Sequence, residues 1–366
     1  MNRRKSFLNI AIGIGSQILS IILGIIIPRL FLTNFGSEMN GFLNSIGQIF
    51  AYFALLEAGV GAATLQALYG PLANNNKKEI SGIMSATDHY YKKTGRLYLM
   101  AVLIVAVGYP LAVSSNIPAW TMIIIILFNG VPGVISYYFQ GKFIILLQAE
   151  GKNYINTALT SISSTIISVA KIIMLLLGCD IIAIQFTYLL INVLKIIVIG
   201  IYIAKNYRWI NLKEEPNYKA IGQKNAAFVN QICDLIFRNT DTIILTIFSG
   251  LKVVSVYTMY TLLYSMIRTA LDYVSQGFSF VMGQTFNRDR ERFIQLHDLY
   301  ETYRMALIFS LYNIALIFII PFMRLYTAGI TDINYLDYKV AVLFSIFYVM
   351  TGARACCSDV DRKSVV

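Results

Sequence analysis

Apolar stretches of about 20 residues recur along the whole chain, separated by short segments that hold most of the charged side chains. Inside a bilayer, a helix satisfies all its backbone hydrogen bonds within one segment, so such stretches indicate membrane-spanning helices. The pattern predicts an all-α polytopic membrane protein. We expect ten spans, near residues 7–30, 42–68, 97–114, 119–147, 155–178, 181–204, 226–249, 253–280, 304–323 and 336–353.

Charge placement predicts the orientation of these helices. Of the 366 residues, 57% are hydrophobic and only 13% are charged, far fewer charges than in a soluble domain. Lysines and arginines, Lys142 and Lys152 among them, gather in alternate loops, and cytoplasmic loops collect such residues. We therefore expect a multi-pass protein of the cytoplasmic membrane with a cytoplasmic N-terminus. The net charge of +11 is spread over several loops, so no nucleic-acid partner is expected.

The chain offers little for catalysis. Its two histidines, His89 and His297, both fall in expected inner loops, and no expected outer loop is long enough to enclose a substrate. The four cysteines show no disulfide or metal-ligand spacing. We predict a protein that is not an enzyme and that has neither a metal site nor a cofactor.

A polar loop at 205–225 follows the sixth expected helix and predicts a boundary between two helical bundles. Residues 1–205 would form a six-helix N-terminal lobe, and residues 206–354 a partial C-terminal lobe of four helices. The segments after the first and seventh helices resemble each other weakly, as in transporters built from repeated halves. Residues 355–366 follow an abrupt change in composition and are expected to be a non-native tail.

Several expected helices carry polar side chains at helical spacing. Ionisable groups at membrane depth mark substrate and ion pathways, because a charge is costly there unless it faces water or a partner. The candidates for a cavity lining are Arg238, Arg268, Lys195, Asp234, Asp241, Asp272, Tyr264 and Asn230.

Two interpretations of these residues remain open. In the first, the lobes enclose a hydrated central cavity whose cations Lys195, Arg238 and Arg268 bind a phosphate, while polar side chains bind sugars. In the second, each arginine pairs with an aspartate one turn away as a structural salt bridge. Lys171, near the outer end of its helix, is expected to extend its ammonium group to the interface.

Other positions predict a site for a coupling ion and points at which helices bend. Glu57 lies deep in the second helix, where a carboxyl group can bind a coupling proton or sodium ion, or contact a nearby polar group. Pro28 and Pro132 interrupt long apolar runs and are candidate hinges, although a static kink is equally consistent with them. Residues 77–93 have the pattern of an amphipathic helix lying on lipid headgroups.

Three segments carry a family resemblance: Ile25-Ile-Ile-Pro-Arg-Leu-Phe-Leu-Thr-Asn-Phe-Gly-Ser-Glu-Met-Asn-Gly, Leu55-Leu-Glu-Ala-Gly-Val-Gly-Ala-Ala and Arg238-Asn-Thr-Asp-Thr-Ile-Ile-Leu. They resemble the polysaccharide biosynthesis branch, which includes O-antigen flippases, of the multidrug/oligosaccharidyl-lipid/polysaccharide exporter superfamily. The resemblance implies two six-helix bundles around a central cavity, a fold of the multidrug-exporter (MATE) type, and alternating access. This chain departs from that pattern by ending near the tenth helix, so its second bundle is incomplete.

The resemblance further implies that the substrate is a polyprenyl-pyrophosphate-linked oligosaccharide, flipped across the membrane for surface polysaccharide synthesis. Membrane lipids and the polysaccharide polymerase machinery are the other expected partners. A cation-coupled multidrug exporter is the alternative, disfavoured by the excess of basic residues at membrane depth. An integral membrane glycosyltransferase or polymerase is a third possibility, which the short outer loops argue against.

Overall fold

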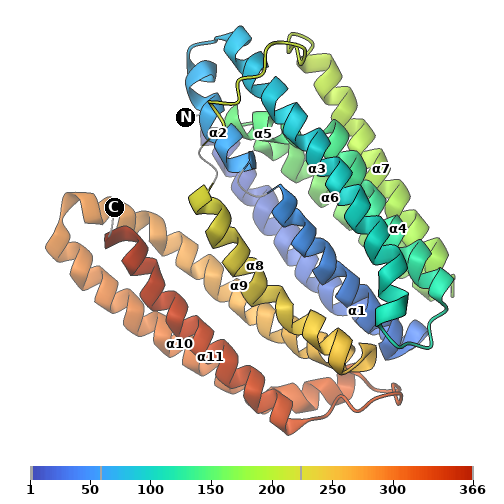
Figure 1. Cartoon of the computed structure of the whole chain (residues 1–366). Coiled ribbons are helices and arrows are strands. Elements are labelled where there is room, and N and C mark those ends of the chain that lie inside the picture. The colour runs from blue at the N-terminus through green and yellow to red at the C-terminus, as the bar shows by residue number, and fades with distance from the viewer. Residues whose placement is uncertain (1–2, 58–59, 223–224, 365–366) are drawn as a thin grey trace. The chain divides into compact units, whose positions relative to one another are not determined.

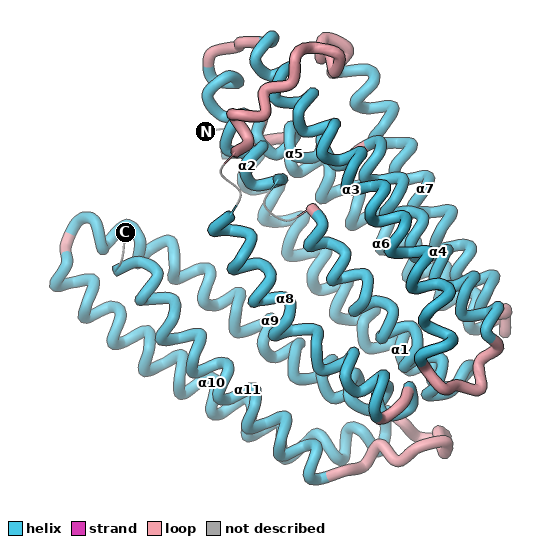
Figure 2. Tube along the Cα trace, in the orientation of Figure 1, coloured by secondary structure: helices cyan, strands magenta, loops and turns pink. Residues whose placement is uncertain are grey.

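The computed structural model describes residues 3–57, 60–222 and 225–364, and the part that it describes consists of helices and loops without a strand (Figures 1 and 2). This confirms the predicted all-α fold class. Within the helices, side chains are described from Ile22 onward, except those of 54, 225–232, 234, 235, 238, 273, 274, 276–284, 286–288 and 355–364.

Eleven α-helices and one 3-10 helix make up the described part. In chain order they are α1 (Arg3–Phe53), η1 (Ala54–Leu56), α2 (Val60–Ala73), α3 (Lys77–Ala112), α4 (Ala119–Phe139), α5 (Gly141–Ala149), α6 (Asn153–Leu176), α7 (Ile181–Asn206), α8 (Asn225–Phe248), α9 (Leu251–Arg288), α10 (Arg290–Tyr326) and α11 (Tyr338–Ser364). The chain divides into two compact units, Met1–Val254 and Ser255–Val366. The predicted lobe boundary after residue 205 stays a prediction.

One break in the helices falls between two expected spans, and another falls inside an expected span. The helix α1 joins the first expected span to the second through a sharp turn at Gly36, whose φ of 75° and ψ of 177° suit glycine. The second expected span is then interrupted again at η1. Pro28 and Pro132, the candidate hinges, lie inside α1 and α4, and both helices continue through them.

The first unit packs around α3 and α4, with α7 against α4 and α6 against both α1 and α7. Its outward faces are apolar: Ile104, Val107 and Leu111 of α3 are 71%, 63% and 84% exposed. Such a surface suits lipid better than water. Among the described residues, five helices (α3, α4, α6, α7 and α10) are long and apolar enough to cross a membrane.

The prediction of a surface helix at 77–93 is wrong. These residues form the first half of α3, which begins after Asn76, where the Asn76 side chain accepts a hydrogen bond from the backbone of Glu79 at 3.2 Å. Ile80, Ile83 and Met84, which were expected to face headgroups, are buried in the core of the first unit. An amphipathic pattern indicates an apolar partner, and here that partner is protein.

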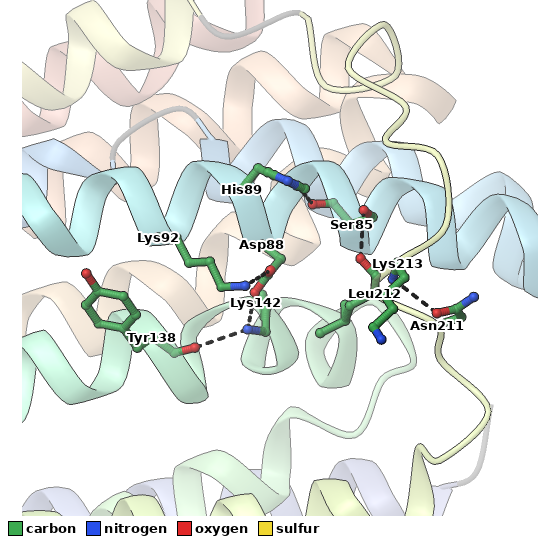
Figure 3. Close-up of polar contacts among 9 residues, drawn as sticks. All are labelled: Ser85, Asp88, His89, Lys92, Tyr138, Lys142, Asn211, Leu212 and Lys213. Atoms are coloured by element: carbon green, nitrogen blue, oxygen red, sulfur yellow. Dashed lines mark hydrogen bonds and ion pairs between the residues drawn. The ribbon is translucent and has the colours of Figure 1, made fainter.

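Lys142, which the charge pattern grouped with the basic residues of the inner loops, lies in a helix. It is the second residue of α5 and is buried, where its ammonium group pairs with Asp88 of α3 and donates to the Tyr138 carbonyl at 3.1 Å (Figure 3). Lys92 approaches the same Asp88 carboxylate at 2.7 Å but is itself half-exposed. Thus a buried ion pair joins α3 and α5, and each of its two charges has a partner of opposite sign.

In the second unit, α10 and α11 pack together and α9 supplies a column of tyrosines. Tyr264 is fully buried, with ring centroids 6.0 Å from Tyr312 and 5.3 Å from Tyr348. Its hydroxyl contacts Ser345 and lies 3.2 Å from the Ala341 carbonyl. Aromatic packing and hydrogen bonding therefore hold α9 against α10 and α11.

Replacing Lys142 with methionine should destabilise the protein by about 3–5 kcal/mol, because it leaves Asp88 buried with only a half-exposed partner. Lys92→Met is the matched control, since it removes an exposed partner of the same carboxylate and should cost at most about 1 kcal/mol. Unfolding midpoints in detergent measure both effects. The double variant Asp88→Leu/Lys142→Met should recover most of the loss; equal midpoints for Lys142→Met and Lys92→Met would contradict this account.

Candidate functional site

A carboxyl group lies at the break in the second expected span. The helix stops at Phe53, passes through η1, and resumes at Val60, whose backbone N–H donates to the Glu57 carbonyl at 3.2 Å. The Glu57 side chain accepts a short hydrogen bond from the Tyr91 hydroxyl, and the Tyr137 hydroxyl reaches the same group. Glu57 therefore meets two phenolic donors from α3 and α4 at the point where its own helix is interrupted.

Aromatic rings surround this carboxyl group. Tyr98 packs on Tyr137 with centroids 5.2 Å apart, and Phe53 packs edge-on against Tyr98 at 5.3 Å. Glycines admit two of these rings: a Cβ at Gly133 would lie 2.5 Å from the Tyr98 hydroxyl, and one at Gly141 would lie 2.2 Å from Tyr91 Cε1. The site is a carboxyl group in an aromatic cage inside the first unit.

Two lysines of the membrane-spanning helices complete the polar interior of this unit. Lys171 of α6 lies over the ring of Tyr188 of α7, at 5.2 Å from the centroid, and its extension to the interface stays a prediction. Lys195 of α7 is half-buried. Among the described side chains, neither lysine has a carboxylate within ion-pair distance. In this respect they differ from Lys142, whose ammonium group pairs with Asp88.

The remaining predicted cavity residues have different surroundings in the structure. Arg268 and Asp272 pair one turn apart with Nε and Oδ2 separated by 3.8 Å, which is the structural salt bridge left open as the second interpretation. Tyr264 is fully buried among helices, and its place in a cavity stays a prediction. Asp241 is exposed on α8. The side chains of Asn230, Asp234 and Arg238 lie outside the described residues.

The sequence analysis missed Tyr91, Tyr137 and Asp88. Tyrosines are common throughout this chain, so no pattern separated these two from the other twenty-two. Asp88 was visible as an acid among lysines in an expected loop, but its buried partner lies 54 positions away. A signal did exist at Gly133 and Gly141, because glycine in an apolar span marks the close approach of another group.

The segment that follows α7 is fixed to the first half of α3. Ser85 donates to the Leu212 carbonyl at 3.0 Å, and the Asn217 backbone N–H donates to the Gly82 carbonyl at 3.0 Å (Figure 3 shows the first contact). At the start of this segment Tyr207 donates to Glu150 at 2.6 Å, and Lys152 pairs with that carboxylate at 2.6 Å. Burial and this carboxylate raise the pKa of the Tyr207 hydroxyl.

The fold resembles those of two solved membrane proteins. It resembles a solved structure titled an inward-facing conformation of a multidrug resistance MATE family transporter of the MOP superfamily, with a TM-score of 0.69, 13% identity and coverage of 91% of this chain and 78% of that one. It also resembles a lipid II flippase, MurJ, in an inward closed conformation, with a TM-score of 0.67, 17% identity and coverage of 96% and 75%. No protein-family model and no curated protein sequence matches the chain.

These likenesses establish the fold: the chain has the helical architecture shared by a MATE exporter and a lipid flippase. They confirm the predicted fold of the MATE type, and neither is a solved structure of the polysaccharide branch itself. The carboxyl cage and the two lysines lie within the first unit of this architecture.

Gly141→Ala should push Tyr91 away from Glu57, because the added methyl group would lie 2.2 Å from the ring. We expect a loss of about 1–3 kcal/mol of unfolding free energy, the usual cost of overpacking. Gly200→Ala in α7 is the matched control: nothing lies within 4 Å of its added Cβ, and the change should be neutral or slightly stabilising. Chemical denaturation in detergent gives both values, and a neutral Gly141→Ala would refute the close packing of Tyr91.

Proposed function

We propose that this protein is a transporter, not an enzyme, that flips a polyprenyl-pyrophosphate-linked oligosaccharide across the cytoplasmic membrane for surface polysaccharide synthesis. The N-terminus is cytoplasmic in this proposal, and the substrate passes between inner and outer leaflets by alternating access. The fold shared with a MATE exporter and a lipid II flippase supports transport as the general activity. The polymerase that would use the flipped product is the expected protein partner.

The observation that carries the choice of an anionic substrate is the pair of lysines Lys171 and Lys195. A buried cation without a carboxylate is costly in a membrane protein unless it meets an anion or water during function. Lys142, Lys92 and Arg268 each have an acidic partner, whereas these two have none among the described side chains. A pyrophosphate group supplies the missing negative charge, and the nearby Tyr188 and Asn192 offer polar groups for the sugar.

A cation-coupled multidrug exporter is the second candidate, and the cage around Glu57 is what favours it. A carboxylate among aromatic rings suits an organic cation, through charge and through the ring faces. In the flippase proposal the same Glu57 is the coupling site, which exchanges a proton or a sodium ion. Lys171 and Lys195 decide between these candidates, because they repel a cationic drug and attract a pyrophosphate. The integral membrane glycosyltransferase stays a remote third.

Lys195→Ala should reduce flipping of a polyprenyl-pyrophosphate oligosaccharide about tenfold or more, because a hydrogen bond between charged groups contributes about 1.5–3 kcal/mol. Lys195→Arg should retain much of the activity, since the charge is kept. The measurement is protection of a fluorescent lipid-linked oligosaccharide from an outside quencher in proteoliposomes. Lys205→Ala, at the exposed inner end of the same helix, is the control and should flip at the original rate.

Glu57→Gln should abolish the dependence of transport on an imposed proton or sodium gradient while leaving substrate binding largely intact, because the neutral amide cannot exchange an ion. The same proteoliposomes, loaded with either the lipid-linked oligosaccharide or the cationic dye ethidium, separate the two candidates. Gradient-driven export of ethidium with no flipping of the lipid would overturn the flippase and support the drug exporter. If neither the lipid-linked oligosaccharide nor ethidium is transported, both candidate functions are contradicted.

A further inference from the structure

Two cations of α3 lie at the end of an exposed apolar stripe. Lys93 and Arg96 are exposed, and no described carboxylate lies within ion-pair distance of either side chain. Lys92, beside them, differs because it pairs with Asp88 at 2.7 Å (Figure 3). Farther along the helix, at spacings of three and four residues, the exposed side chains form what we call the α3 stripe: Leu97, Met100, Ile104, Val107 and Leu111. This spacing places Lys93 and Arg96 on the same face of α3 as the stripe.

The neighbouring helix α4 indicates the depth of these cations in the membrane. It has 21 residues and is therefore about 30 Å long, the thickness of the hydrocarbon core. Exposed aromatic side chains, Trp120 and Phe139, lie at its two ends, as is common at the headgroup level. Gly95 of α3 packs against the ring of Tyr138, because a Cβ there would lie 3.0 Å from Cε2. Arg96 therefore lies at the headgroup level, and the α3 stripe crosses the hydrocarbon.

A basic side chain at this level without an acidic partner attracts the phosphate of a lipid headgroup. Each lysine or arginine near an anionic membrane surface contributes about a fivefold gain in affinity. From Leu97 to Val107 the helix rises about 15 Å, which is the hydrocarbon thickness of one leaflet. The acyl chains of a lipid whose phosphate meets Lys93 and Arg96 can therefore pack along the α3 stripe.

The C-terminal end of α7 differs, although basic residues adjoin exposed apolar side chains there too. Lys205 lies in the last turn of α7, and the Arg208 Nε donates to the Ala204 carbonyl at 3.1 Å. Cations at a helix C-terminus interact favourably with its free carbonyl groups. Lys93 and Arg96 lie in the interior of α3, where the carbonyls bond within the helix, so they lack this alternative partner.

We propose that Lys93 and Arg96 bind the phosphate of an anionic phospholipid whose acyl chains pack on the α3 stripe. In the orientation proposed above, this lipid belongs to the inner leaflet. Tyr91 and Tyr98, which lie around Glu57, are buried on the opposite face of α3, so the lipid site is separate from the proposed coupling site. The proposal does not depend on what the protein transports.

Native mass spectrometry of the full chain in detergent tests the site with phosphatidylglycerol and with phosphatidylcholine of the same acyl chains. Lys93→Gln/Arg96→Gln should weaken binding of phosphatidylglycerol about tenfold or more and leave that of phosphatidylcholine unchanged. Lys205→Gln/Arg208→Gln is the matched control, because it removes the same charge, and it should change either affinity by less than about twofold. Equal losses in the two variants would overturn the site and show only a general attraction to basic surfaces.

Brominated lipids provide a second measurement that leaves both cations in place. A tryptophan introduced on the α3 stripe as Met100→Trp, with Trp120 and Trp209 replaced by phenylalanine, reports the adjacent lipid. In vesicles of both lipids in equal amounts, brominated phosphatidylglycerol should quench it about twice as strongly as brominated phosphatidylcholine. Leu194→Trp, at an exposed position of α7, is the control and should be quenched equally by both. Equal quenching at Met100→Trp would overturn the proposal, even if the charge variant fails to fold.

The transported lipid of the proposed function also carries phosphate, so a competition separates the two sources. Polyprenyl pyrophosphate, added at the same concentration as phosphatidylglycerol, should leave phosphatidylglycerol bound. Complete displacement of phosphatidylglycerol would overturn the phospholipid site and assign the surface to the transported lipid. None of these measurements requires transport, so their failure is distinct from failure of the flippase proposal.

Discussion

A helix that breaks inside a bilayer must find partners for its freed backbone and for any charge at the break within the protein, because lipid offers none. The break at Glu57 shows how far this constraint reaches. Its carboxyl group takes hydroxyl donors from Tyr91 and Tyr137, on two different helices. The Tyr91 ring in turn occupies the space that a side chain at Gly141 would need. One interrupted helix thus specifies the tyrosines of α3 and α4 and the glycine at which α5 begins.

The all-α fold and most of the spans could be predicted because hydropathy responds to membrane burial, which is a local property of about 20 residues. The break at η1 could not, since it falls inside the apolar run 42–68 that predicts a single span. The turn at Gly36, by contrast, falls between the spans expected at 7–30 and 42–68. The environment of α3 was predicted wrongly for a related reason. Periodicity shows that a helix has an apolar face, but headgroups and neighbouring helices satisfy that face equally well.

The candidate site was predicted in part, and pairing explains the difference. In the sequence, Lys142, Arg268 and Lys195 are all basic residues in or near apolar spans, and the pattern does not show which of them has an acidic partner. In the folded chain Lys142 meets Asp88 from another helix, and Arg268 meets Asp272 on its own helix. Lys195 meets no described carboxylate. Only three-dimensional contacts separate a cation with a carboxylate partner from one without, so the proposed function rests on Lys195 and Lys171 rather than on every cation in the membrane.

The second half of α1 connects the contact with α8 to the carboxyl group of Glu57, the coupling site of the proposed function. It is a helical rod between the turn at Gly36 and the break at η1, and it carries Ser45 and Tyr52 on the face toward α8. Glu57 follows directly after η1, held by α3 and α4 rather than by α8. Tyr52, one residue before the rod ends at Phe53, bonds to Thr240 of α8, so the contact with α8 extends along the rod as far as the break. In the proposed function, exchange of an ion at Glu57, five positions beyond Tyr52, alters its bonds to Tyr91 and Tyr137. The coupling site and the contact with α8 therefore lie next to each other along the chain, one on each side of η1.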